Sequence, residues 1–347
     1  MRIAELYELR KFRIVNGSVE DPGPGQVQVR VEAVGICGSD IHEFAEGGIG
    51  GRPCQYPMVM GHEPTGVVVK TGPGVTACAP GDRAAFEPAI YCYRCEFCLA
   101  GHHNLCENMQ FLSSPGIPGF FREYVNLPVE CILPLPAGVG FVEGTLFEPL
   151  AVVLLSMTHA AIRPLETAAV FGAGPIGLMT VIVLKMCGAG RVWVVEPVPH
   201  RRQMAKAAGA DAVLDPHQLD AARQIFSDTA NRGVDVTIDC ATKENSVNQC
   251  IRMTRRGGRL VVTGVPAELE VSFDMHTARR RGLSIHHTRR SNHTSQAALQ
   301  LLREHPRRFL PILTHTLPLE KIQSGFNLLE NCTDGAGKVV ISLTQPA

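Results

Sequence analysis

The sequence has no excess of charge of either sign, since its 347 residues include 33 Lys and Arg and 33 Asp and Glu. Such a balance gives no global field that would recruit nucleic acid or an anionic membrane surface. Long apolar runs are also lacking, and residues 178–186 fall well short of the ~20 residues that span a bilayer. The first residues reach charged side chains early, so we expect no signal peptide. We therefore expect a cytoplasmic protein without nucleic-acid or membrane partners.

The chain also lacks the cysteine spacing of a disulfide framework, although it has 12 cysteines. Eight are scattered singly, and four lie within fifteen residues. In a cytoplasmic chain, such a tight cluster is typical of a metal site. The composition is otherwise that of a globular protein, with 45% hydrophobic and 19% charged residues. The length predicts two domains, because single cores seldom exceed roughly 250–300 residues.

Residues 1–90 follow the period of a β-strand. Residues 26–34 alternate in polarity, and residues 66–70 run into the turn residues 71–74. Prolines and glycines at positions 22–25 precede the first of these strands. The pattern predicts a domain of short β-strands, more plausibly a barrel than a sandwich.

The cysteine cluster follows as Cys92-x2-Cys95-x2-Cys98-x7-Cys106. Short steps of this kind let four thiolates converge on one ion, and a site with four sulfur ligands leaves no position open for substrate. We therefore predict a structural zinc site that stabilises a lobe with few apolar residues. An iron–sulfur centre or free thiols are the alternatives.

Beyond residue 150, strands and helices alternate. The expected strands lie at residues 168–171, 191–196, 212–214, 234–240, 259–264 and 283–287. Alternation of this kind predicts a parallel, doubly wound sheet. From about residue 295, a helix at 297–303 and a strand at 338–343 leave the pattern and are candidates to rejoin the first domain.

A glycine fingerprint follows the first of these strands and opens a helix. Gly172 permits a tight turn, Gly174 lets the backbone approach a pyrophosphate, and Gly177 lets the helix pack on the strand. Pro175 and Ile176 complete the motif at the helix N-terminus, which favours phosphate binding.

Glu196 ends the second strand, where it can accept hydrogen bonds from both ribose hydroxyls of the adenosine half of the cofactor. A 2′-phosphate would meet like charge at Glu196, so we predict NAD rather than NADP. Arg201 and Arg202 could grip a 2′-phosphate instead, although a solvated helix face explains them better.

A third set of residues offers a thiolate, an imidazole and carboxylates: Cys37, His62, Glu63 and Glu148. A zinc ion with three protein ligands and one open position uses such a mixture of donors. Taken singly, each of these residues would more often be structural.

These motifs together resemble the zinc-dependent medium-chain dehydrogenase/reductase family over nearly the whole chain. The motifs are Cys37, Gly61-His62-Glu63-x2-Gly66-x5-Gly72, Gly81-Asp82-Arg83, the four cysteines and the glycine fingerprint. The segments Met109-Gln110-Phe111, Ser114-Pro115 and Glu148-Pro149-Leu150 resemble its sorbitol (polyol) dehydrogenase branch, whereas alcohol dehydrogenases of the family have a cysteine where Glu148 stands.

The resemblance implies a GroES-like β-barrel catalytic domain at residues 1–149 and 290–347, with a Rossmann domain inserted at 150–289. It implies two zinc ions per subunit, NAD, and a homotetramer or homodimer. By this resemblance, Cys37 and His62 are ligands of the catalytic zinc and Glu63 is its carboxylate ligand. Glu148 either ligates the zinc or forms a hydrogen bond with the zinc-bound water.

The resemblance also implies hydride transfer from an alcohol to NAD, with zinc as Lewis acid and Ser39 and His42 as a proton relay. Asp40 is more plausibly structural, holding its turn through hydrogen bonds. Phe111 and Arg290 are candidate substrate residues, and the run Arg279-Arg280-Arg281 reads better as a surface turn than as an anion site.

We expect a polyol or secondary-alcohol substrate. A threonine-type amino alcohol is the alternative among enzymes. A non-catalytic protein that senses the nicotinamide ratio is the alternative from another class, against which the intact set of candidate catalytic residues argues.

Overall fold

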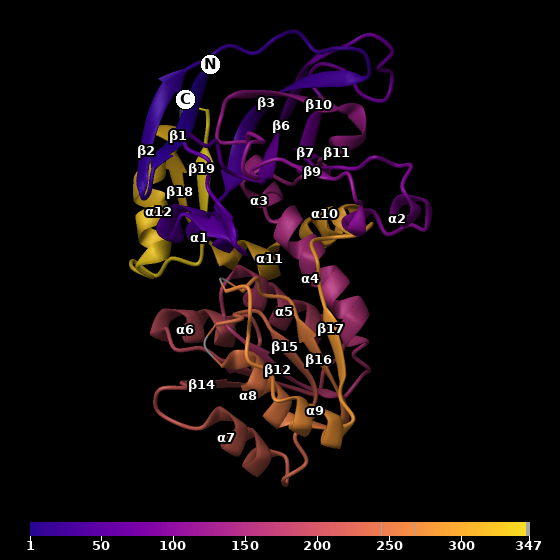
Figure 1. Ribbon diagram of the computed structural model, residues 1–347, viewed down its shortest axis with the longest axis vertical. Coiled ribbons are helices and arrows are strands. Elements are labelled where there is room, and N and C mark those ends of the chain that lie inside the picture. Colours follow the sequence, from indigo (N-terminus) through magenta and orange to yellow (C-terminus); the bar gives the residue numbers. More distant parts are fainter. Residues whose placement is uncertain (244, 267, 345–347) are drawn as a thin grey trace. The chain divides into compact units, whose positions relative to one another are not determined.

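The structure, a computed structural model, describes residues 1–243, 245–266 and 268–344. It divides into two compact units, drawn in Figure 1. The first contains Met1–Glu148 and Ser295–Ala347, and the second contains Pro149–Thr294. The boundaries expected from the sequence, after residues 149 and 289, differ slightly from those given by the contacts, after residues 148 and 294.

A seven-stranded sheet forms the core of the first unit, in the order β11-β7-β6-β3-β19-β18, with β10 paired to β3. Val27, Val29 and Val31 of β3 face the core, because alternate side chains of a strand point to the same side. The strands of this sheet are β3 (Gln26–Gly35), β6 (Glu63–Thr71), β7 (Arg83–Phe86), β10 (Tyr124–Pro128), β11 (Ile132–Pro134), β18 (Leu313–Pro318) and β19 (Lys338–Ser342).

The last strand ties the C-terminal segment to this sheet. β19 runs antiparallel to β3, with Val340 opposite Gly35, and parallel to β18. The remaining strands of the unit are β1 (Arg2–Glu8), β2 (Lys11–Asn16), β4 (Gly48–Ile49), β5 (Arg52–Pro53), β8 (Ala89–Ile90) and β9 (Gln110–Phe111). Its helices include α1 (Gly38–Glu46), α2 (Glu96–Leu99), α3 (Phe141–Gly144), α10 (Ser295–Glu304), α11 (Pro306–Phe309) and α12 (Ile322–Glu330).

The second unit is built on a six-stranded parallel sheet with the order β14-β13-β12-β15-β16-β17. The chain starts at β12 in the middle and winds outward in both directions, so the sheet has a switch point beside β12, where ligands of such folds bind. The strands are β12 (Thr167–Phe171), β13 (Arg191–Val195), β14 (Ala212–Leu214), β15 (Val234–Asp239), β16 (Thr254–Val262) and β17 (Ser284–His287). Helices between them are α5 (Pro175–Met186), α6 (Pro199–Ala207), α7 (Ala221–Asp228), α8 (Ser246–Met253) and α9 (Met275–Arg281).

One stretch, Phe141–Ala160, is long and apolar enough to cross a membrane by length and composition, with a mean hydropathy of 1.4. It contains α3 and α4 (Phe147–Ala160). Glu143 and Glu148 divide this stretch into shorter apolar runs, so it does not stand out in the sequence as one long apolar run. This is weak evidence for a membrane span, because 61% of the apolar window is buried, and buried core helices have the same composition.

Candidate active site

Cys37, His62 and Glu63 converge in the first unit, where their ligand atoms all lie within 4.8 Å of one another. Cys37 immediately precedes α1, and His62 immediately precedes β6, which Glu63 begins. His62 is 6% exposed and Glu63 is fully buried. The structure thus brings together a sulfur, a nitrogen and an oxygen donor from two distant segments.

The hydrogen bonding of this group fits a metal ion. In residues 1–243, 245–266 and 268–344, the buried Oε1 atom of Glu63 has no hydrogen-bond partner. Buried polar atoms rarely remain unsatisfied unless a water, an ion or a catalytic role explains them. A donor set of one thiolate, one imidazole and one carboxylate is typical of a zinc site that keeps an open fourth position.

Asp40 organises the approach to this group. Its Oδ2 accepts a 2.9 Å hydrogen bond from the backbone N–H of Cys37, and its Oδ1 accepts a 3.5 Å bond from the Ser113 hydroxyl. The structural role predicted for Asp40 is therefore confirmed.

Asp40 also sets the charge environment of His62. Its Oδ1 lies 3.3 Å from His62 Nδ1, within ion-pair distance but without the alignment of a hydrogen bond. Burial would lower the pKa of His62, but the negative Asp40 and Cys37 outweigh burial and raise that pKa well above its usual value. A carboxylate beside the second ring nitrogen is the usual way to orient a metal-binding histidine.

Glu148, in the first turn of α4, is 9% exposed but does not join the convergent group. Burial raises the pKa of Glu148 to about 7; His62 lowers it, and the Glu63 carboxylate raises it. Its carboxyl group is therefore electrostatically linked to the site, and the geometry favours Glu63 as the ligand.

Ser39 and His42 lie on α1 beside the group. The hydroxyl of Ser39 is 3.4 Å from His62 Nε2, and His42 Nδ1 is 3.0 Å from Glu46 Oε1. Each of these two side chains thus has its own partner, so a relay between them needs an intermediate group.

Sequence reasoning missed Lys338, a fully buried lysine at the start of β19 that forms an ion pair with Glu63. The sequence feature that could have indicated a buried lysine is its position directly before the apolar residues Val339, Val340 and Ile341.

The two candidate substrate residues lie in different units. Phe111 of β9 lies against His62, with ring centroids 5.3 Å apart, so its side chain borders the metal group. Arg290 belongs to the second unit and has a positive φ of 55°.

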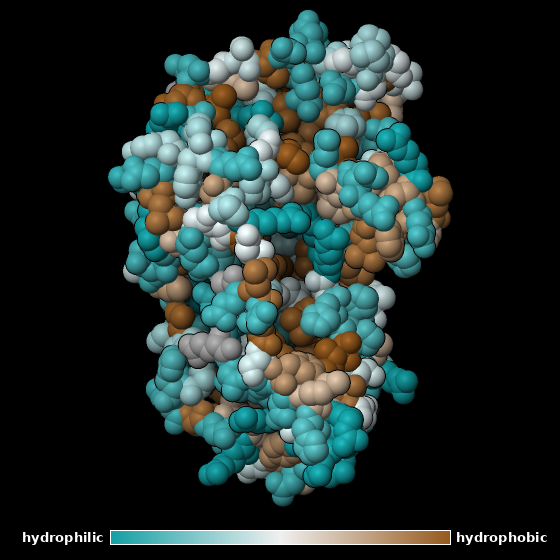
Figure 2. Space-filling view, viewed as in Figure 1, coloured by the Kyte–Doolittle hydropathy of each residue, from teal (hydrophilic) through white to brown (hydrophobic). Residues whose placement is uncertain are grey.

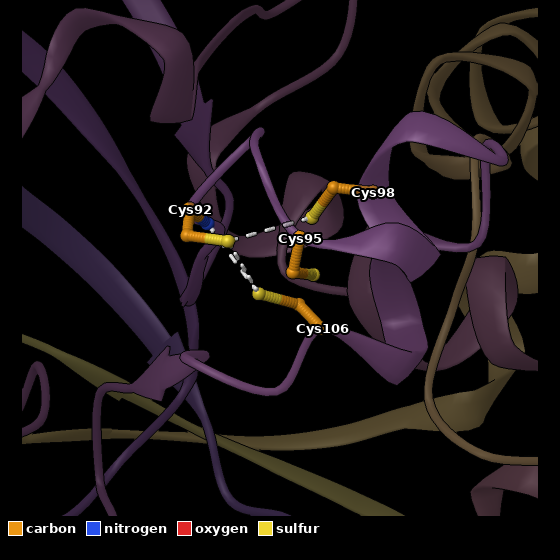
Figure 3. Close-up of side chains that lie close together, drawn as sticks. All are labelled: Cys92, Cys95, Cys98 and Cys106. Atoms are coloured by element: carbon orange, nitrogen blue, oxygen red, sulfur yellow. Dashed lines mark hydrogen bonds between the residues drawn. The ribbon is translucent and has the colours of Figure 1, made fainter.

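The four cysteines predicted to bind a structural metal also converge, as Figure 3 shows. The sulfur of Cys92 lies 3.5 Å from that of Cys106 and 4.0 Å from that of Cys98. Four thiolates at about 2.3 Å from one zinc ion would lie about 3.8 Å from each other. The spacing therefore fits a tetrahedral site, and all four cysteines are free of disulfides.

The lobe around these cysteines has little apolar core of its own. Leu99 is 77% exposed, Tyr93 is 49% exposed and Leu105 is 39% exposed. Figure 2 shows apolar surface over the region of α2. Backbone N–H groups of Arg94 and Cys95 help lower the pKa of the Cys92 thiol to about 6, which favours the thiolate that binds a metal.

In the second unit, the glycine fingerprint forms the turn from β12 into α5. Gly172 has a φ of 85°, which a side chain would strain, and a Cβ at Gly177 would collide with the carbonyl oxygen of Gly172. A Cβ at Gly174 would meet no atom within 4 Å, so open space adjoins the N-terminus of α5, which begins at Pro175. Ile176 is the second residue of α5. This open space suits a phosphate group.

Glu196 directly follows β13 and is 3% exposed. Its carboxylate accepts hydrogen bonds from the backbone N–H of Ala173 at 2.6 Å and of Val198 at 2.9 Å. The acid predicted to bind the ribose thus borders the glycine turn. Arg202 donates hydrogen bonds to the carbonyls of Glu196 and Pro197 and pairs with Asp215. The buried Nε of Arg201, by contrast, has no hydrogen-bond partner among the residues that the structure describes.

Comparison with known proteins gives the same two-part division. Residues 23–137 match the family model "Alcohol dehydrogenase GroES-like domain", and residues 175–304 match "Zinc-binding dehydrogenase". A sorbitol dehydrogenase of Bacillus subtilis is 34% identical over 275 residues, which cover 79% of this chain and 78% of that protein. A probable D-xylulose reductase A of Emericella nidulans is 39% identical over 76% of this chain and 74% of its own length.

Among solved structures, a candidate zinc-binding dehydrogenase from Sinorhizobium meliloti 1021 with NADP bound superposes with a TM-score of 0.89. It is 30% identical, and the match covers 98% of each chain. The predicted fold class, a GroES-like domain with a Rossmann-type parallel sheet, is confirmed. The chain is an oxidoreductase that belongs to the zinc-dependent medium-chain dehydrogenase/reductase family, in its polyol dehydrogenase branch.

Proposed function

We propose that this chain is an NAD-dependent zinc dehydrogenase that oxidises a polyol or a related secondary alcohol to a ketone. The observation that carries the proposal is the convergence of Cys37, His62 and Glu63, a set of sulfur, nitrogen and oxygen donors that fits a metal with an open position. The relatives named as a sorbitol dehydrogenase and a xylulose reductase support a polyol as the substrate class.

Two metal ions have distinct roles in this proposal. Cys37, His62 and Glu63 would hold the catalytic zinc, and the four clustered cysteines would hold a structural one. A zinc ion at the first site supplies Lewis acidity, which favours loss of the proton from a substrate hydroxyl. Asp40 keeps the His62 ring oriented, and Phe111 bounds the space beside that ring.

The proton would leave through α1. The half-buried Ser39 hydroxyl, 3.4 Å from His62, would accept this proton while it passes its own proton through an intermediate group toward His42. His42 is 14% exposed and pairs with the solvent-facing Glu46, so it is the proposed point of exchange with water. General acid–base groups of this kind contribute about 10²–10⁴-fold to a rate.

NAD is the proposed hydride acceptor. The buried carboxylate of Glu196 borders the glycine turn and would accept the ribose hydroxyls while repelling a 2′-phosphate. The similar structure solved with NADP makes the choice of cofactor a matter for measurement. A homodimer or homotetramer and a cytoplasmic location stay predictions.

The test is a panel of sugar alcohols, sugar acids, threonine and simple secondary alcohols, each assayed with NAD and with NADP. The proposal expects NADH formation with at least one polyol, at a higher kcat/KM than with threonine. A higher kcat/KM with threonine than with any polyol would make an amino alcohol the substrate class. No turnover of any alcohol would favour a non-catalytic protein that senses the nicotinamide ratio.

A further inference from the structure

Lys338 is a buried cation whose anionic partner is a candidate metal ligand. Its side chain is 1% exposed, and its ammonium group donates a 2.8 Å hydrogen bond to the carbonyl of Ile36. The ammonium also forms an ion pair with the carboxylate of Glu63, which is fully buried. Lysine is almost never fully buried unless it is paired, because removing its charge from water costs several kcal/mol.

The orientation of the Glu63 carboxylate depends on its ion pair with Lys338. In residues 1–243, 245–266 and 268–344, Lys338 is the one Lys or Arg in ion-pair contact with Glu63. The ammonium of Lys338 contacts Oε2 of the carboxylate, and Oε1 has no hydrogen-bond partner in that part of the chain. The direction in which the carboxylate points is therefore set by Lys338 on one side and by the Cys37–His62 group on the other.

The order of strands brings the two residues together. β3 lies between β6 and β19, and Gly35 of β3 is opposite Glu63 on one side and opposite Val340 on the other. A Cβ at Gly35 would collide with the Glu63 carboxylate and would lie 2.9 Å from Lys338 Cε. Glycine at this position leaves the space in which the ion pair crosses the central strand.

Holding the fold together is a weaker explanation of this ion pair. β19 is already held by its ladders to β3 and β18. Well-packed apolar residues in place of a buried ion pair often leave stability unchanged or raise it. The placement of the pair against the metal group gives it a use that an apolar pair could not serve.

We infer that Lys338 is a positioning residue that holds the Glu63 carboxylate in the ligand set of the catalytic metal. The inference rests on the proposed zinc site. It makes the last strand of the chain part of the metal centre, 275 residues after the ligand that it orients. Residues that orient metal ligands typically change metal affinity about 10–100-fold when they are replaced.

The test measures zinc release from the purified protein to a chromogenic chelator. For Lys338→Met, we expect the zinc of the Cys37 site to leave about 10–100-fold faster than in the unmodified protein. The zinc of the four-cysteine site should leave at the same rate, which provides an internal control. Lys70→Met is the matched control, because it breaks the exposed Lys70–Asp21 ion pair of the same unit.

Two further variants separate positioning from stability. Gly35→Ala retains both charges but displaces the Glu63 carboxylate, and should also speed release from the Cys37 site alone. It remains informative if Lys338→Met fails to fold. In a Glu63→Gln background, Lys338→Met should add no further effect on release, because the ligand that it orients has already been changed.

The inference is overturned if Lys338→Met or a folded Gly35→Ala releases zinc at the unmodified rate, or if both sites lose zinc equally faster. An additive effect in the Glu63→Gln background would also overturn it. These outcomes differ from failure of the proposed function, in which the unmodified protein itself binds no zinc outside the four cysteines.

Discussion

The Glu196 carboxylate accepts a 2.6 Å hydrogen bond from the backbone N–H of Ala173, so the acid that follows β13 is tied to the glycine turn that follows β12. One carboxylate thus has two possible uses. It holds the turn in shape, and we predict that it also accepts the hydroxyls of the adenosine ribose. The two uses predict different outcomes when the charge is removed.

For Glu196→Gln, we expect kcat/KM with NAD to fall by about 10–100-fold, because hydrogen bonds to a charged group contribute about 1.5–3 kcal/mol. The value with NADP should change less or rise, since the repulsion of a 2′-phosphate is relieved. Steady-state kinetics with both cofactors measures this, with the exposed Glu270→Gln as control. Equal losses with both cofactors would assign Glu196 to the turn alone.

Cys98→Ser should remove the structural metal. Cys98 is 5% exposed, and its sulfur lies 4.0 Å from that of Cys92, inside the tetrahedral group. The lobe has few buried apolar side chains, so we expect a lower Tm and one zinc per chain in place of two. Calorimetry and elemental analysis measure these changes. Substitution of the exposed Cys187 by serine, the control, should alter neither. A Cys98→Ser protein with unchanged Tm would contradict a structural role for this metal.

The stability of the second unit should depend on pH through Asp235. Burial alone would raise the pKa of Asp235, but hydrogen bonds from Arg232, Thr167 and Arg255 hold it well below its usual value. A depressed pKa stabilises the folded state above the unfolded pKa of about 3.9, and this contribution is lost as the pH falls below that value.

Asp235→Asn should therefore lower the free energy of unfolding by about 2 kcal/mol at neutral pH, in line with a lost charged hydrogen bond. The difference from the unmodified protein should shrink at about pH 3, where the unfolded carboxyl group is already protonated. Urea unfolding at both values measures it. If the difference in the free energy of unfolding between the two proteins grew as the pH fell, the pKa of Asp235 would not be depressed in the folded state.

Local patterns predicted most of the strands, but not the contacts between distant segments. The period of residues 26–34 and the apolar run at 168–171 appear as β3 and β12. β16 begins at Thr254, five residues before the strand expected at 259, because Thr254 pairs with Val234 and the register then shifts between Val234 and Val236 to accommodate the polar and glycine-rich segment.

In the candidate site, too, local patterns predicted some residues, whereas contacts between distant segments were not predicted. Spacing along the chain predicted the four cysteines and the glycine turn, since each depends on short-range geometry. It could not predict the pairing of Lys338 with Glu63, because that contact exists only once β19 has added to the sheet beside β3. Nor could it decide between the two carboxylates, of which the structure brings Glu63 to Cys37 and His62.

The most direct test of the catalytic metal centre is the zinc content of Cys37→Ala, measured together with NAD binding and turnover. We predict one zinc per chain, held by the four cysteines, with NAD affinity unchanged and turnover nearly abolished. Two zinc ions per chain with the kcat of the unmodified protein would contradict the account.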